Sequence, residues 1–338
     1  MRRTTEADTP DRPFATRVWL IVGQVSISAG LLVYLLWDIP FSSLYSVAAS
    51  ASLPLVIVGM VAMLFSHWLD AVQMMWALVR QRIAVGSGTV LRINFISMFY
   101  SLFLPTMIAA GAIRWYHFTR LEQKPAKALA AILFNRVFET LLLVTVGVLA
   151  FIASQRGPIQ LDRGALMLAA LMLVLATHFI AFNRHFHRWA ESLVDRVPLP
   201  ARLRTALHAL LGALSRFDHL GAAFYLKLFA LGFLRQAVAV ALIMVFVRAL
   251  DIDADALTIA WIRSLIGILT MMPLSIAGLG IREATFVVAL GQFGVPAESA
   301  LMLSLLIFAR TVVYGLAGGL IEAYRIFVAE KKTIGPRR

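Results

Sequence analysis

Apolar runs of about 20 residues recur along this chain from residue 18 to residue 325, and they limit its fold more than any other feature. A helix of that length crosses the roughly 30 Å of hydrocarbon in a bilayer. A mean hydropathy of +0.83 with only 14% charged residues excludes an ordinary soluble domain. We therefore predict an all-α, polytopic protein integral to the cell (inner or cytoplasmic) membrane. The early residues lack a signal-peptidase cleavage pattern, so the first span is expected to remain as an anchor.

The apolar segments fall into two kinds, because some are interrupted. The uninterrupted spans are 18–37, 53–79, 128–154, 164–183, 222–249 and 299–325. Two further segments, 93–113 and 257–290, contain Pro105 and Pro273. Broken backbone is tolerated at membrane depth only where it is buried in protein or lines a wet cavity. We therefore predict about six full transmembrane helices plus two re-entrant helical hairpins that lie inside the bundle.

The basic residues predict the orientation in the membrane. If both hairpins return to the side they entered from, one side holds 23 Lys and Arg residues and the other holds three. The positive-inside rule then places both termini in the cytoplasm. The 23 residues lie in the tail 1–17, the loops 80–92, 114–127 and 184–221, Lys227, and the C-terminal tail together with Arg325 just before it. The net charge of +13 thus reflects topology and attraction to anionic membrane lipids, and no nucleic-acid partner is expected.

The two halves of the chain resemble each other. "PTMIAAGAIR" at 105–114 and "PLSIAGLGIR" at 273–282 match at five of ten positions without a gap, against about one expected by chance. With an odd number of crossings per half, the second half is inverted relative to the first. We predict a cytoplasmic tail 1–17, a first membrane repeat 18–163, a second repeat 164–325 and a cytoplasmic tail 326–338. Paired broken helices in inverted repeats mark the binding sites of transporters.

The loop 184–221 is the only long polar stretch between the spans, and it is too short for a catalytic domain. Its leucines recur at helical spacing, at Leu203, Leu207, Leu210, Leu211 and Leu214. This pattern predicts an amphipathic helix, which either lies in the cytoplasmic membrane interface or serves as an ordinary connector.

No motif of an enzyme is visible in the sequence. There is no zinc signature, nucleophile elbow or nucleotide phosphate-binding loop, and the chain has no cysteine. We expect no catalytic residue, bound metal or cofactor. Ionisable groups within the spans remain, each of which costs about 3 kcal/mol or more if exposed to lipid. These are Asp70, Arg136, Glu139, Arg235 and Arg310. As alternatives to a substrate path, Arg136 and Glu139 form a structural ion pair, and Asp70 and Arg235 neutralise each other.

The stretch "MPLSIAGLGIREATF" at 272–286 carries the clearest motif. Gly278 and Gly280 predict a tight turn with exposed N–H groups before a half-helix, whose N-terminus attracts anions. Arg282 offers a planar fork that fits phosphate oxygens, and Glu283 either steadies this arginine or binds a substrate amine. Arg114 ends the matching segment of the first half. The alternative is that Arg114 and Arg282 only close the hairpins through backbone carbonyls.

The pattern P-x-x-x-x-G-x-G-x-R-E, from Pro273 to Glu283, resembles the signature of the lysylphosphatidylglycerol synthase transmembrane region, also described as flippase-like integral membrane proteins. "FNRVFETLLLVTVG", with Arg136 and Glu139, resembles the Arg-containing middle span of that family. The resemblance covers roughly residues 20 to 325 and implies movement of lipids with modified or glycosylated headgroups between leaflets. The cytoplasmic aminoacyl-transfer or glycosyltransferase domains of some members have no counterpart in this sequence.

We therefore expect a lipid flippase that moves an anionic or modified-headgroup lipid, such as an aminoacylated or glycosylated phospholipid, between leaflets. Glu139 and Glu283 are the candidate proton carriers. The alternatives are a translocase for a polyprenyl-phosphate-linked sugar, a non-transporting assembly partner of a membrane glycosyltransferase, and a membrane enzyme acting on a lipid phosphate. A second copy of the chain or a separately encoded lipid-modifying enzyme is a further candidate partner. The predicted substrate-binding residues are Arg114, Arg136, Glu139, Gly278, Gly280, Arg282, Glu283 and Arg310.

Overall fold

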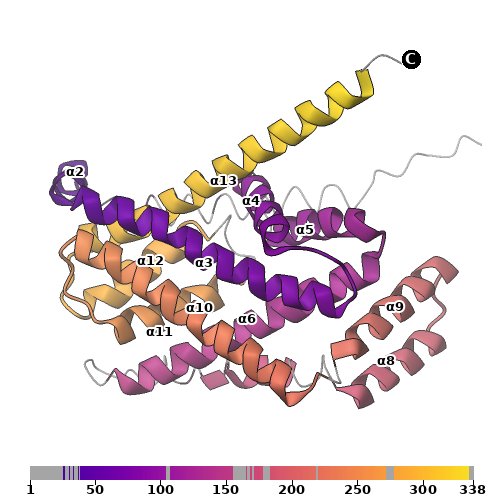
Figure 1. The fold of residues 1–338 in the computed structure, drawn as a ribbon. Coiled ribbons are helices and arrows are strands. Elements are labelled where there is room, and N and C mark those ends of the chain that lie inside the picture. The colour runs from indigo at the N-terminus through magenta and orange to yellow at the C-terminus, as the bar shows by residue number, and fades with distance from the viewer. Residues whose placement is uncertain are drawn as a thin grey trace, which may run out of the picture.

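The computed structural model describes residues 39–103, 107–154, 171–177, 183–217, 220–271 and 278–334, together with residues 26, 30, 33, 37, 165, 168 and 169. Helices and their connections make up all of these segments, and no strand occurs in them. The protein is thus an all-α membrane protein, as its hydropathy predicts (Figure 1).

Four helices are long and apolar enough to cross a bilayer. They are α3 (Leu53–Arg80), α6 (Pro125–Ala153), α10 (Ala222–Ala249) and α13 (Ala297–Ile334). They confirm four of the six predicted spans, and the other two, 18–37 and 164–183, lie largely outside the described residues. Helix α13 continues to Ile334, beyond the predicted end at 325, because no proline or glycine lies between residues 325 and 334.

Two shorter helices form the first hairpin, α4 (Ser87–Phe103) and α5 (Met107–Glu122). Glu122, at the end of α5, accepts a hydrogen bond of 2.6 Å from the backbone N–H of Ala84, just before α4. Lys124 Nζ donates to the carbonyl of Arg82 at 2.9 Å and also pairs with Glu122. The Lys124 ammonium and the Ala84 N–H together hold the pKa of Glu122 below its usual range. The chain therefore enters α4 and leaves α5 at one end of the bundle, which we call the basic end.

The second hairpin consists of α11 (Ala256–Leu269) and α12 (Ile281–Gly291), and it begins and ends at the opposite end. Trp261 near the start of α11 contacts Phe293 just after α12 and Phe151 near the end of α6, with ring centroids 6.4 and 5.7 Å apart. At the same end the Ser52 N–H donates to the Ala249 carbonyl at 2.8 Å. The turns between paired helices, 104–106 with Pro105 and 272–277 with Pro273, lie outside the described residues.

Glycines allow both hairpins to approach long helices closely. A Cβ added at Gly318 of α13 would lie 1.9 Å from the backbone oxygen of Phe95 on α4. A Cβ added at Gly267 of α11 would lie 2.3 Å from the side chain of Leu143 on α6. Small residues at helix crossings are the usual means by which membrane helices pack. Each hairpin thus packs against the last long helix of the other half of the chain.

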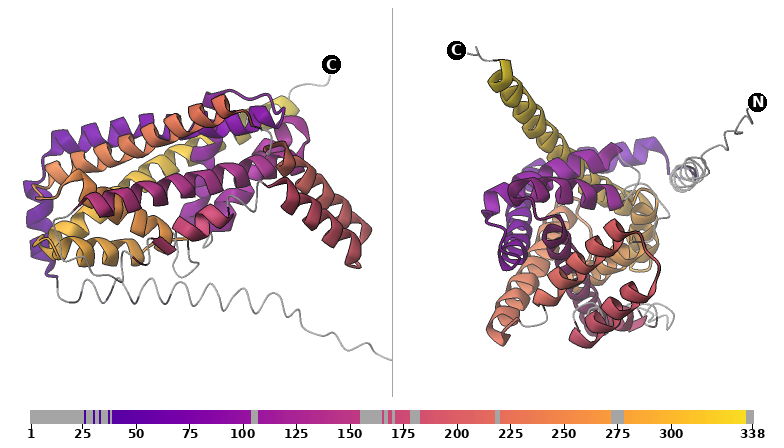
Figure 2. Two further views of the ribbon diagram at one scale, coloured as in Figure 1. Left: turned by 90° about the horizontal axis from the view of Figure 1, so that it is seen from below. Right: turned by 90° about the vertical axis from the view of Figure 1, so that its right-hand side faces the viewer.

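A pair of peripheral helices, α8 (Arg184–Arg196) and α9 (Ala201–Leu214), projects from one end of the bundle, opposite to α2 (Phe41–Ser50) (Figures 1 and 2). His208 and Asp195 join α8 to α9 at 3.0 Å. Gln81 Nε2 donates to the Ala213 carbonyl at 2.8 Å and fixes α9 to the basic end. Helix α9 confirms the predicted amphipathic helix, while its place in the membrane interface stays a prediction.

The apolar core is divided into two main clusters. One gathers side chains toward the basic end, including Met74, Phe118 and Phe134. The other gathers side chains toward the opposite end, including Phe246 and Trp261. On α3 and α10, His67, Asp70, Arg235 and Gln236 lie between residues of the two clusters, and ionisable side chains of α6 and α13 contact this part of α3 and α10. We call this region the polar layer and define it by the residues described next.

Candidate functional site

The first part of the polar layer is a carboxylate–arginine cluster built from four helices. Arg235 Nη1 of α10 lies 3.6 Å from Asp70 Oδ1 of α3 and 3.9 Å from Glu139 Oε1 of α6. The Asp70 and Glu139 carboxyl groups also lie within electrostatic range of each other. Asn94 Nδ2 of α4 donates to Asp70 at 3.1 Å, and Asn135 Nδ2 donates to Glu139 at 2.8 Å. The ion pair between Asp70 and Arg235, considered from the sequence as an alternative to a substrate path, is present.

Further amide groups and one more arginine border this cluster. Gln73 Nε2 donates to Asn135 Oδ1 at 3.0 Å. Arg263 Nη1 of α11 donates to Gln236 Oε1 of α10 at 2.5 Å. Arg263 also lies in the electrostatic field of Arg235, Arg310 and Glu139. The cluster therefore reaches across the bundle to the second hairpin.

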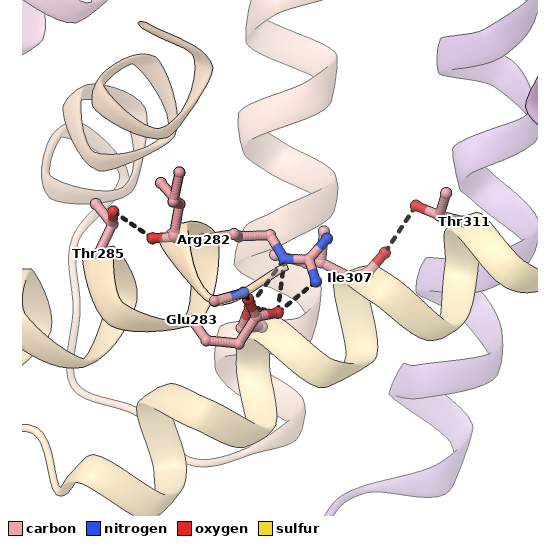
Figure 3. A network of polar contacts seen from close by, with 8 residues as sticks. Arg282, Glu283, Thr285, Ile307 and Thr311 are labelled. Atoms are coloured by element: carbon pink, nitrogen blue, oxygen red, sulfur yellow. Dashed lines mark hydrogen bonds and ion pairs between the residues drawn. The ribbon is translucent and has the colours of Figure 1, made fainter. Parts of the chain in front are cut away.

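The second part of the polar layer is the Arg282 cluster at the start of α12 (Figure 3). Arg282 forms an ion pair with Glu283 and donates from Nε to Ser304 Oγ of α13 at 2.9 Å. The Ser304 hydroxyl donates to Glu283 Oε1 at 3.1 Å. The Arg282 guanidinium also lies 5.2 Å from the centroid of the Phe308 ring. Glu283 and Ser304 are both fully buried.

The glycine turn before α12 takes the predicted conformation. Gly278 and Gly280 have φ values of +75° and +84°, which non-glycine residues rarely adopt, and α12 begins at Ile281. The Gly280 N–H donates to Glu283 Oε2 at 2.7 Å, so this N–H is bound within the protein. Glu283 thus caps the N-terminus of its own helix and forms an ion pair with Arg282. This ion pair agrees with one of the two roles that the sequence suggests for Glu283, that of holding Arg282 in place.

Arg310 of α13 lies between the two clusters. Its Nη1 contacts Met63 Sδ of α3 at 3.4 Å, and it lies within the electrostatic range of Arg282 and of His67. One turn later the Tyr314 hydroxyl donates to the Met60 carbonyl. The His67 ring packs edge-on against Tyr314, with centroids 4.9 Å apart. These contacts join α13 to α3 at the level of the polar layer.

Arg114 and Arg136 complete the set of predicted residues. Arg114 of α5 lies within electrostatic range of Asp70, Glu139 and His67. The Arg136 side chain is exposed on α6 and acts on Asp70 from there. The binding of one substrate by both Arg114 and Arg282 stays a prediction.

Several arginine atoms in the polar layer are buried and have no hydrogen-bond partner among the described residues. These atoms are the Nε groups of Arg114, Arg235 and Arg310. His67 Nε2 is also buried and has no hydrogen-bond partner among the described residues. A buried N–H without an acceptor costs about 1–3 kcal/mol, and more when the group is charged. Such groups therefore suit a ligand that supplies acceptors.

Five residues of the polar layer were not predicted from the sequence: Gln73, Asn94, Gln236, Arg263 and Ser304. A signal for most of them was present, because amide or charged side chains within an apolar run are costly and tend to face the bundle interior.

The fold and this interior of charged side chains define a polytopic α-helical membrane protein with a polar centre. The model of the family described as the lysylphosphatidylglycerol synthase TM region matches residues 21–319, and the chain belongs to that family. The comparison with curated proteins returned no match. The resemblance stated from the sequence is thereby confirmed.

Proposed function

We propose that this protein is a lipid translocase whose polar layer binds an anionic headgroup while the lipid tails stay in the bilayer. The observation that carries the proposal is the set of buried, unpartnered Nε groups on Arg114, Arg235 and Arg310, which come from three different helices. Membership of a membrane family associated with lipids supports the same reading.

The charge balance of the polar layer supports an anionic ligand. Five arginines of the layer with non-exposed side chains (Arg114, Arg235, Arg263, Arg282 and Arg310) lie with three carboxyl groups (Asp70, Glu139 and Glu283), so these eight residues carry a surplus of at least two positive charges. The undescribed hairpin turns, 104–106 and 272–277, contain no ionisable side chain. Uncompensated charge at membrane depth is costly, so an anion that enters this layer is stabilised there.

Side chains of the polar layer are partly exposed, as a path for a lipid headgroup requires. The side chains of Arg235, Asp70 and Glu139 keep 13%, 18% and 16% of their surface exposed, so the layer is not sealed. We place the basic end in the cytoplasm, because Arg82, Lys124 and the arginines of α8 and α9 gather there. The two hairpins would then be re-entrant, one from each side of the membrane.

The order of the helices supports an inverted repeat. Helices α3, α4, α5 and α6 are followed by α10, α11, α12 and α13 with the same order of long, short, short and long. The turns after α3 and α10 correspond: Arg82 and Asp251 have positive φ, and Ile83 N and Ile252 N each donate at 3.0 Å five residues back. We propose that the repeats 18–163 and 164–325 exchange conformations so that the polar layer faces each leaflet in turn.

Reconstitution tests the proposal. The full chain is placed in liposomes with phosphatidylglycerol that carries a fluorophore on its acyl chain, with and without an imposed pH gradient. A membrane-impermeant quencher then reports how fast the lipid changes leaflet. We expect faster exchange than in protein-free liposomes. Exchange at the protein-free rate would favour the assembly partner, and a chemically altered lipid would favour an enzyme.

A further inference from the structure

The carboxylates of the polar layer are already bound by groups of the protein. Glu283 accepts from the Gly280 N–H, from Arg282 and from Ser304. Asp70 and Glu139 share Arg235, and each accepts one amide N–H, from Asn94 and Asn135 respectively. An ammonium group is a donor only and needs acceptors. An ammonium group would therefore have to compete with a protein cation for every carboxylate described in this layer, with Arg282 for Glu283 and with Arg235 for Asp70 and Glu139.

The fully buried groups that lack a hydrogen-bond partner have the opposite character. The charged ones are donors, the Nε groups of Arg114, Arg235 and Arg310. The unpartnered acceptors beside the carboxylate–arginine cluster are neutral amide oxygens, Gln73 Oε1 and Asn94 Oδ1. Arginine donors suit phosphate oxygens, and neutral amide oxygens suit hydroxyl groups.

From this inventory we propose that the site selects an anionic lipid phosphate whose headgroup substituent is neutral and hydroxylated, such as a polyol or a sugar. Headgroups that carry an ammonium group, aminoacylated lipids among them, are disfavoured. The inference rests on the proposed function and narrows its substrate class. It separates the glycosylated from the aminoacylated lipids, both of which the sequence leaves open.

The test compares two lipids that differ only by an aminoacyl group. Tail-labelled phosphatidylglycerol and tail-labelled lysylphosphatidylglycerol are measured in the same proteoliposomes, with and without a pH gradient. Because like-charge juxtaposition costs several kcal/mol, we expect lysylphosphatidylglycerol to exchange at least about tenfold more slowly. If it exchanges as fast or faster, the inference is overturned and the translocase stands. If neither lipid exchanges, the translocase itself fails, and the inference fails with it.

A pair of nearly isosteric variants tests the role of charge directly. Met63 is 1% exposed, and its sulfur accepts from Arg310. Met63→Glu would supply that arginine with a carboxylate and lower the charge surplus, whereas Met63→Gln supplies a neutral acceptor of the same size. We expect the phosphatidylglycerol preference to fall at least about fivefold in Met63→Glu relative to Met63→Gln, at equal protein in the membrane. Equal preference in the two variants would contradict the charge-based selection.

The same chemistry would also suit a soluble phosphate, so a further arm measures uptake of radiolabelled glycerol 3-phosphate into the proteoliposomes. We expect no uptake above that of protein-free liposomes. Uptake of glycerol 3-phosphate without exchange of phosphatidylglycerol would overturn the assignment to a lipid.

Discussion

At the scale of single residues, Arg282 and Glu283 differ from Arg114 and Arg310 in their hydrogen-bond partners. The Arg282 guanidinium is bound to Glu283 and Ser304, and Glu283 also caps α12. The Nε groups of Arg114 and Arg310 have no partner among the described residues. We therefore infer that the first pair positions the start of α12, while the second pair meets the headgroup.

This difference predicts how substitutions at the Arg282 cluster behave. Arg282→Ala leaves the fully buried Glu283 without its cation, which costs about 3–5 kcal/mol. We expect a lower midpoint of thermal unfolding in detergent and less protein in the membrane. The double variant Arg282→Met, Glu283→Met should recover much of the loss, because no buried charge is left unpaired. A double variant less stable than Arg282→Ala would argue against a positioning role.

At the scale of helices, the sequence predicted the features that depend on hydropathy and turn composition. It did not predict which side chains of different helices contact each other. The run from 222 to 249 has the same bounds as α10, and the glycine turn at Gly278 and Gly280 has the positive φ that its composition predicts. A periodic pattern gives the interior face of a helix but not the side chain opposite it. For that reason the pairing of Asn94 with Asp70 and that of Ser304 with Arg282 could not be predicted from the sequence, although Asn94 stands out as a polar residue in an apolar run.

The crossing of α4 and α13 gives a prediction at this scale. A Cβ at Gly318 would lie 1.9 Å from a backbone oxygen of Phe95, which cannot move without shifting α4. We expect Gly318→Ala to destabilise the protein by about 1–3 kcal/mol or more, measured by thermal unfolding. Gly212→Ala is the matched control, because Gly212 also lies in a helix and nothing surrounds its Cβ position within 4 Å. Equal stability of the two variants would contradict the close crossing.

At the scale of the whole molecule, the two hairpins enter from opposite ends of the bundle and pack against α13 and α6. We propose that this arrangement exchanges between two states related by a pseudo-two-fold axis in the membrane plane, as alternating access requires. The charge distribution is unequal: Arg82 and Lys124 lie at the basic end, while Asp251 and Asp253 follow α10 at the opposite end.

Cysteine labelling tests the topology, because the natural chain has no cysteine. Single cysteines at Gly86 and Lys124 should react with an impermeant reagent only from the cytoplasm, and a cysteine at Asp253 only from outside. Such a pattern requires the first hairpin to return to its own side. Labelling of positions 86 and 124 from opposite faces would mean that segment 93–113 crosses the membrane fully.

The central claim is that the unpartnered arginines of the polar layer carry the headgroup, and one measurement tests it most directly. The rate of leaflet exchange of tail-labelled phosphatidylglycerol is compared between the natural protein, the double variant Arg114→Gln, Arg310→Gln, and Arg120→Gln. Arg120 lies on the same helix as Arg114 but is exposed and contacts Tyr116. Loss of buried charge partners predicts a fall of more than about a hundredfold in the double variant at equal protein amount, with Arg120→Gln near the natural rate. A natural rate in the double variant would contradict the claim.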